Sequence, residues 1–141
     1  YEINIGDWSS DVCSSDLVTA GVKVTVKTEY QPSYSNPLQE HFVFTYRICI
    51  ENNSLNTIQL LRRKWLIFDS NGTVREVEGE GVIGVQPVLE TGETHEYVSG
   101  CNLKTTIGKM MGSYLMEIMI DGKQFFVKIP EFNLIVPYRL N

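Results

Sequence analysis

The sequence predicts an all-β sandwich of two antiparallel sheets, and three observations carry this prediction. Short runs alternate between apolar and polar residues, as strands with one buried face do. Turn residues such as Asn-Gly and Asp-Gly separate these runs at short intervals. No window shows an apolar repeat of 3.6 residues, the pattern of an amphipathic helix. Roughly seven to nine strands are expected, which fits one domain of two packed sheets.

Three strands are expected in the first half of the chain, over residues 22–30, 42–50 and 58–69. In the second of them every other residue is apolar. Because successive side chains of a strand point to opposite faces, this stripe is expected to face the core. Its members are Phe42, Phe44, Tyr46, Ile48 and Ile50. Trp65 could stack on a ligand, but a Trp in the middle of a sandwich strand is more often part of the core.

Two hairpins are expected in the second half. Asn71-Gly72 predicts a tight turn that folds residues 73–78 back on the preceding strand. Asp121-Gly122 predicts a second turn, between strands over 113–120 and 123–129.

The other segments of the second half are less regular. A strand is expected over 94–99 and a last short strand over 132–138. Between them, the glycine-containing stretch 100–112 is expected to be a long loop.

Residues 1–17 are expected to lie outside the domain, which then spans residues 18–141. The segment 7–17 reads DWSSDVCSSDL and has neither strand alternation nor a helical stripe. It resembles the translation of a widely used sequencing adapter, so we expect a non-native, disordered leader that arose as an assembly artefact. A genuine polar leader rich in Ser and Asp is the alternative.

Charge and hydropathy argue against two classes of partner. The formal net charge is −5, but residues 1–17 carry four carboxylates and no Lys or Arg. Without them, 13 acidic and 12 basic residues remain, so no basic face for nucleic acid is expected. No apolar stretch approaches the roughly 20 residues that cross a bilayer, and no signal peptide is visible. We therefore expect a cytoplasmic protein that binds neither nucleic acid nor membrane.

The residues that usually perform catalysis or bind metals are few. The cysteines Cys13, Cys49 and Cys101 are odd in number and widely spaced, which argues against a disulfide framework. With His41 and His95 they form no C-x-x-C or H-x-x-H pair, so no structural zinc is expected. No nucleophile with a nearby base emerges either. We expect no catalytic residue, metal site or cofactor.

The segment 79–84 spells GxGxxG, the fingerprint of a dinucleotide-binding turn. That fingerprint opens a helix, whereas here Pro87 follows in an extended stretch, so the dinucleotide interpretation fails. We expect an exposed, irregular connection between the sheets that forms part of a binding surface. The candidate binding residues are Gly79, Gly81, Gly84 and Gln86. A backbone anion nest is one alternative, and glycines needed only for turns and close strand approach are the other.

Five motifs follow one another through the chain. They are FxFxYxIxIEN over 42–52, QLLRRKW over 59–65, GxGVxGxQP over 79–87, YxSGC over 97–101 and GxMxGSY over 108–114. In this order and spacing they resemble the ApaG family, over about residues 18–136. The resemblance implies an immunoglobulin/fibronectin type III-like sandwich of two antiparallel sheets, in a small bacterial protein. Lys64 stands where the family often has His, so a metal role for that position is not carried over.

Two functions remain open. The resemblance implies a non-enzymatic module that binds another protein, since similar domains in F-box proteins look like interaction modules. The alternative is a protein that binds a nucleotide or polyphosphate through the segment 79–84. Lys104 and Lys109 could then assist from the stretch expected to be a loop.

Overall fold

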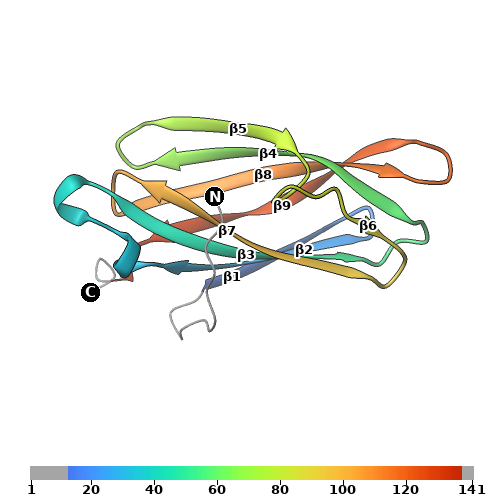
Figure 1. The fold of residues 1–141 in the computed structure, drawn as a ribbon, viewed down its shortest axis with the longest axis horizontal. Helices are drawn as coiled ribbons and strands as arrows, with labels where there is room; N and C mark the ends of the chain where they lie inside the picture. The colour runs from blue at the N-terminus through green and yellow to red at the C-terminus, as the bar shows by residue number, and fades with distance from the viewer. Residues whose placement is uncertain (1–12, 138–141) are drawn as a thin grey trace.

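The computed structural model describes residues 13–137 and places in them nine strands, arranged as a sandwich of two antiparallel sheets (Figure 1). The first sheet has the order β1 (Cys13–Thr19), β2 (Val22–Tyr30), β3 (Phe42–Asn52) and β7 (Thr94–Leu103). The second has the order β5 (Val74–Glu80), β4 (Ile58–Asp69), β8 (Ile107–Ile118) and β9 (Gln124–Ile135), with β6 (Val88–Leu89) also paired to β4. Single 3-10 turns lie at Pro32–Tyr34 and Pro37–Gln39. The predicted fold class is confirmed.

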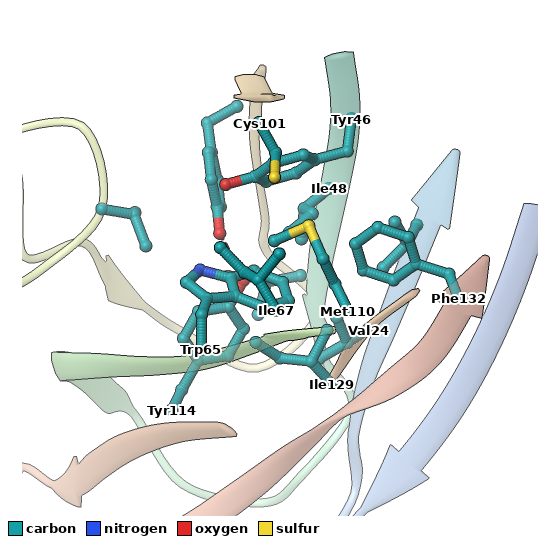
Figure 2. Packing of buried hydrophobic residues seen from close by; sticks show 14 of the residues in the cluster. Val24, Tyr46, Ile48, Trp65, Ile67, Cys101, Met110, Tyr114, Ile129 and Phe132 are labelled. Atoms are coloured by element: carbon teal, nitrogen blue, oxygen red, sulfur yellow. Dashed lines mark hydrogen bonds between the residues drawn. The ribbon is translucent and has the colours of Figure 1, made fainter. Parts of the chain in front are cut away.

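A single apolar core fills the space between the sheets. Phe44, Tyr46, Ile48 and Trp65 are all buried, as the alternation predicted. The Trp65 ring lies 5.4 Å from that of Tyr46 and 5.8 Å from that of Phe132, measured between centroids (Figure 2). Tilted and edge-to-face aromatic contacts at this spacing stabilise a core beyond the apolar area that they bury.

Strand β1 corrects the predicted start of the domain. Residues 13–17, expected to pack against nothing, belong to β1 and pair with β2. The turn after β1 holds Ala20 at φ 51° and Gly21 at φ 82°, the two positive φ angles of a type I′ hairpin. Over residues 15–19 of β1, Asp16, Leu17 and Val18 are exposed and Ser15 and Thr19 are half-buried, so the buried and exposed side chains do not alternate. The leader expected over residues 1–12 lies outside the described residues.

The prediction of a long loop over 100–112 is wrong, because β7 continues to Leu103 and β8 begins at Ile107. The glycines that suggested a loop are needed for close contact between strands. A Cβ on Gly108 would lie 2.5 Å from the Phe68 carbonyl oxygen, and one on Gly112 would lie 2.3 Å from that of Lys64. Both distances are far below contact range, so only glycine fits at these positions.

The two strands expected over 123–129 and 132–138 form one strand, β9. Pro130, which cannot donate to a sheet ladder, lies between the two expected strands. It lies where the pairing of β8 with β9 shifts register, between the pairs Gly112–Ile129 and Met110–Phe132. A bulge of this kind accommodates proline within a strand.

A second register shift, in β4, matters for the site described below. The pairing of β4 with β8 shifts between Leu60 and Arg62, so Leu61 is an extra residue on β4. Side chains alternate along a strand, so the bulge reverses which residues point inward. Leu60 before it and Trp65 after it both lie in the core, and Arg63 shares the inward side with Trp65.

The two long sides of the sandwich differ. On one side β9 lies against β1 and β2, and Lys128 N donates to Thr19 Oγ1 at 3.3 Å. On the other side the sheets end in β5 and β7. Arg75 of β5 spans this side, donating through Nη2 to the carbonyl oxygen of Asn102 on β7.

None of the helical turns among residues 13–137 has the length and apolar character of a membrane-crossing helix.

Candidate functional site

The candidate site is a pocket of about 240 Å³ on the side of the sandwich where β5 and β7 end the sheets. It is enclosed by β3, β4, β7 and the connection from β5 to β6. Its lining residues are Tyr46, Arg63, Trp65, Val82, Ile83, Gly84, Tyr97 and Ser99. Pockets for whole cofactors or drug-sized ligands are commonly about 300–1,000 Å³, so this one suits a single side chain or a small group.

Arg63 is the charged residue of the pocket lining. The bulge at Leu61 turns it inward, where its side chain is half-buried. Its Nη1 donates to the carbonyl oxygens of Glu80, at 3.1 Å, and Gly81, at 3.0 Å. Within residues 13–137 it has no ion pair with a carboxylate, and its Nε and Nη2 make no hydrogen bond. The site therefore contains a cation that lacks an acidic partner in the described structure.

Two buried phenols lie behind Arg63. The hydroxyls of Tyr97 and Tyr114 are 2.5 Å apart. Burial raises the pKa of Tyr97 well above its usual value, and the neighbouring Tyr114 raises it further. Burial likewise raises the pKa of Tyr114, against a smaller lowering by its hydrogen bond to Tyr97. Both phenols therefore stay neutral at physiological pH and offer hydrogen bonds but no negative charge.

The connection from β5 to β6 contains a tight turn over residues 82–85. Val82 N donates to Val85 O at 2.8 Å, and Val85 N donates to Val82 O at 3.1 Å. Ile83 at φ 45° and Gly84 at φ 75° are the central residues, again as in a type I′ turn. A positive φ is rare for a β-branched residue, yet it lets the Ile83 side chain pack against the core at the pocket.

The predicted binding residues are brought together, but only some are exposed. Gly79 is half-buried in β5 and Gly81 is fully buried, so the expectation of an exposed irregular segment is wrong for both. Gly84 is exposed and lines the pocket. Gln86 is exposed, and its Nε2 donates to the carbonyl oxygen of Leu61 at 2.9 Å, which fastens the connection to the bulge. Their role in binding stays a prediction.

The segment 79–84 also does not join the two sheets. The strands on either side of it, β5 and β6, both pair with β4 and belong to the same sheet. Sequence reasoning missed this because β6 has only two residues and pairs beside the bulge of β4.

Two physical reasons account for the glycines of this segment. A Cβ on Gly81 would lie 2.1 Å from the carbonyl oxygen of Val85, and one on Gly79 would lie 2.7 Å from Nη1 of Arg63. Gly81 therefore needs close approach to the backbone, whereas at Gly79 the contact is with the end of the flexible Arg63 side chain. A Cβ on Gly84 would have no other atom within 4 Å, so only the φ of 75° favours glycine there.

The anion nest loses some of its donors in this geometry, while the N–H groups of Ile83 and Gly84 make no hydrogen bond within residues 13–137. Gly81 N donates to Leu61 O at 2.9 Å, and the N–H groups of Val82 and Val85 bond to each other's carbonyls. A nest needs successive N–H groups that point at the ligand. Here these three are used within the chain.

The lysines expected to assist an anion are not at this site. Lys109 is aligned with Phe68 of β4, whereas the segment with Gly81 begins beyond Arg62. Six residues of strand separate Phe68 from Arg62, a distance of about 20 Å. Lys109 pairs instead with Glu131 at 3.1 Å, and Lys104 N bonds to an Asp69 oxygen at that same far end of β4.

Cys101 lies in β7, not in a loop, and is buried. Burial raises the pKa of its thiol to about 11, although Arg75 lowers it in part. Burial lowers the pKa of His95, which is six residues away on the same strand. No group of three or more His, Cys, Asp or Glu residues in the described part of the chain is arranged to hold a metal ion.

Comparison with known proteins identifies the family. The ApaG domain family matches residues 32–118. The chain is 48% identical over 120 residues to Protein ApaG of Brucella canis, covering 85% of this chain and 92% of that one. It is also 48% identical over 126 residues to Protein ApaG of Paramagnetospirillum magneticum, with 87% and 96% covered.

Solved structures agree with this assignment. The crystal structure of the putative ApaA protein from Bordetella pertussis superposes with a TM-score of 0.79 at 43% identity, covering 82% of this chain and 94% of that one. Domain match, sequence identity and fold therefore agree, and the chain belongs to the ApaG family.

Proposed function

We propose that this chain is a non-enzymatic binding module that recognises a segment of another protein at the Arg63 pocket. The observation that carries the proposal is the pocket itself. Aromatic side chains and a half-buried Arg63 line it, and Arg63 has no carboxylate partner among residues 13–137. Aromatic residues and arginine are the residue types most often found at the energetic centres of protein interfaces.

The ionisable groups near the pocket support binding over catalysis. A nucleophilic cysteine needs a lowered pKa, whereas burial raises that of Cys101 to about 11. The phenols of Tyr97 and Tyr114 have raised pKa values and bond to each other. A general acid or base works best with a pKa near the working pH, which none of these groups has.

An extended polypeptide has a place to lie beside the pocket. Gly81 N donates to Leu61 O, which fixes the residues of β5 that bond to β4. Bonded pairs recur at every second residue of an antiparallel ladder, so the N–H groups of Val74, Glu76 and Glu78 point away from β4. Since β5 ends its sheet, these groups are available to an added strand.

A nucleotide or polyphosphate ligand is the second candidate, and Arg63 is the observation in its favour. Against it stand the pocket's small volume and the three N–H groups already used in the turn.

Photo-crosslinking tests the proposal. A photoreactive phenylalanine analogue replaces Val85, which is exposed beside Gly84, or Phe126, which is exposed on β9. Random peptides displayed on phage are enriched on the immobilised chain and then crosslinked. We expect enriched peptides to crosslink at position 85 and not at position 126. Crosslinking at 126 alone, or calorimetric binding of nucleotides without any enriched peptide, would overturn the proposal.

A further inference from the structure

We infer that the Arg63 pocket recognises the side-chain carboxylate of a Glu or Asp residue in the partner segment. This inference rests on the proposed function and adds the chemistry of the group that enters the pocket. It follows from the charge of the site, the donors left over on Arg63 and the direction in which β5 presents a neighbouring strand.

Arg63 has donors to spare. A guanidinium carries five N–H donors and no acceptor. The hydrogen bonds of Arg63 to the carbonyls of Glu80 and Gly81 both come from Nη1. The N–H groups of Nε and Nη2 have no hydrogen-bond partner in residues 13–137. Guanidinium groups bind carboxylates through two parallel hydrogen bonds, and the remaining donors are sufficient for this arrangement.

The carbonyl contacts also hold the guanidinium in place before a ligand arrives. Arg63 lies so close over Gly79 that a Cβ there would approach its Nη1, Nη2 and Cζ to 3.0 Å or less. Its two carbonyl acceptors are those of the last residue of β5, Glu80, and of the first residue of the connection to β6, Gly81. A donor group fixed in this way loses less conformational freedom on binding, which favours affinity.

The phenols behind Arg63 provide a further donor. In a pair of hydroxyls that share one hydrogen bond, one proton lies between the oxygens and the other is free to be donated elsewhere. Tyr97 lines the pocket, so when Tyr114 donates to Tyr97 the Tyr97 proton can be donated to a carboxylate oxygen. The raised pKa values keep both phenols protonated for this purpose.

The charge of the site matches one negative charge. Arg63 is the cationic residue of the lining, and the nearby Lys64 points outward and pairs with Glu76 at 3.4 Å. A phosphate group carries about −1.5 to −2 charges at neutral pH, which a single guanidinium does not neutralise. A carboxylate carries −1, and its small size suits a pocket of about 240 Å³.

The geometry of β5 favours a side chain over a chain terminus. Val77 is paired with Trp65 and Gly79 with Arg63, so both face the inner side of the sheet. An extended segment added to the free edge of β5 directs every second side chain to that same side. Such a segment continues past the pocket and presents a side chain from its middle, next to Gly79 and Arg63.

A double-mutant cycle tests the inference. The peptides that crosslink at position 85 are made with acetylated and amidated ends, and each Glu or Asp is replaced by Gln or Asn. Calorimetry measures their affinity for the wild-type chain, Arg63→Gln and Arg62→Gln. Arg62 is the matched control, because it is exposed and points to the outer side of β4. Far-UV circular dichroism and thermal unfolding confirm that each variant is folded.

We expect one acidic residue of the peptide whose replacement lowers affinity for the wild-type chain about tenfold or more. The same replacement changes affinity for Arg63→Gln less than about twofold, and Arg62→Gln behaves as wild type. Peptides that crosslink at position 85 but bind equally well without any side-chain carboxylate would overturn the inference and leave the proposed function standing. A requirement for a free C-terminus would overturn it too.

A measurement on the unaltered chain covers the case in which Arg63→Gln does not fold. Glutarate and inorganic phosphate are titrated into protein labelled with nitrogen-15 at arginine. We expect the Nε–Hε signal of Arg63 to shift saturably with glutarate, and that of Arg62 to stay in place. No saturable shift with glutarate, or tighter binding of phosphate, would overturn the carboxylate assignment.

Discussion

Arg63 Nη1 donates to the carbonyl oxygen of Gly81 at 3.0 Å, and this contact joins the bulged strand β4 to the connection from β5 to β6. Each of the two residues depends on a local irregularity of the backbone. The bulge at Leu61 sends Arg63 inward, and only glycine fits at position 81. The pocket therefore depends on two local irregularities that meet.

Replacing Gly81, just before the turn, and Gly84, within it, compares the effect of a steric contact with that of a positive φ. Gly81→Ala places a Cβ against the Val85 carbonyl oxygen, whereas Gly84→Ala meets open space and suffers only from a positive φ. We expect Gly84→Ala to cost about 1–2 kcal/mol of unfolding free energy, and Gly81→Ala to cost more. Urea denaturation of both variants measures this. Equal costs would mean that the turn relaxes away from Val85.

Trp65→Ala tests the core next to the pocket. Trp65 is 3% exposed and contacts the rings of Tyr46 and Phe132. We expect a loss of about 3–5 kcal/mol in unfolding free energy, the range for large-to-small changes of buried aromatics. Leu55→Ala is the control, because Leu55 is 95% exposed. A loss below about 1 kcal/mol for Trp65→Ala would contradict its place in the core.

The tyrosine pair predicts a loss of stability at high pH. Burial raises the pKa of Tyr97 and Tyr114 in the folded chain above the unfolded value of 10. Above pH 10 the unfolded state therefore releases these protons while the folded state retains them. The contribution of the two tyrosines to the free energy of unfolding is therefore fully present below about pH 10. Above that pH the free energy of unfolding falls by about 1.4 kcal/mol per pH unit for each tyrosine.

Urea denaturation between pH 8 and about pH 11 measures this slope. Tyr97→Phe should reduce it, because the buried group that resists ionisation is removed. Tyr34→Phe, at an exposed position, should leave it unchanged. A slope that is the same in wild type and Tyr97→Phe would mean that the phenol ionises freely in the folded state.

Strand β1 predicts a penalty for truncation. A chain that begins at Val18 lacks residues 13–17, which pair with β2. We expect it to be less stable than a chain that begins at Cys13, by about 1–3 kcal/mol, because hydrogen bonds between the strands are lost. Thermal unfolding compares the two. Equal midpoints would instead place the start of the stable domain at residue 18.

The sequence predicts well what depends on local pattern. The alternation over 42–50 identifies the buried side of β3, and Asn71-Gly72 and Asp121-Gly122 identify two hairpins. The family resemblance, which the comparisons confirm, needed motifs along most of the chain. The strand, the two turns and each single motif can be recognised from the sequence because each lies within a few consecutive residues.

The sequence could not predict what depends on contacts between distant segments. Gly108 and Gly112 were expected in a loop, because the carbonyls of β4 that exclude a Cβ at each belong to Phe68 and Lys64, 40 and 48 residues earlier. The buried and exposed side chains of β1 do not alternate over residues 15–19, so they show no strand pattern. The inward position of Arg63 could not be predicted, since nothing in the local residues shows that Leu61 forms a bulge.

The most direct test of the binding pocket is the affinity of one enriched, end-blocked peptide for Arg63→Gln and for Arg62→Gln. The two variants remove the same charge from neighbouring positions of β4, one facing the pocket and one facing solvent. The pocket predicts that Arg63→Gln loses about tenfold or more in affinity, while Arg62→Gln stays within about twofold of wild type. Equal affinities for both folded variants would contradict it.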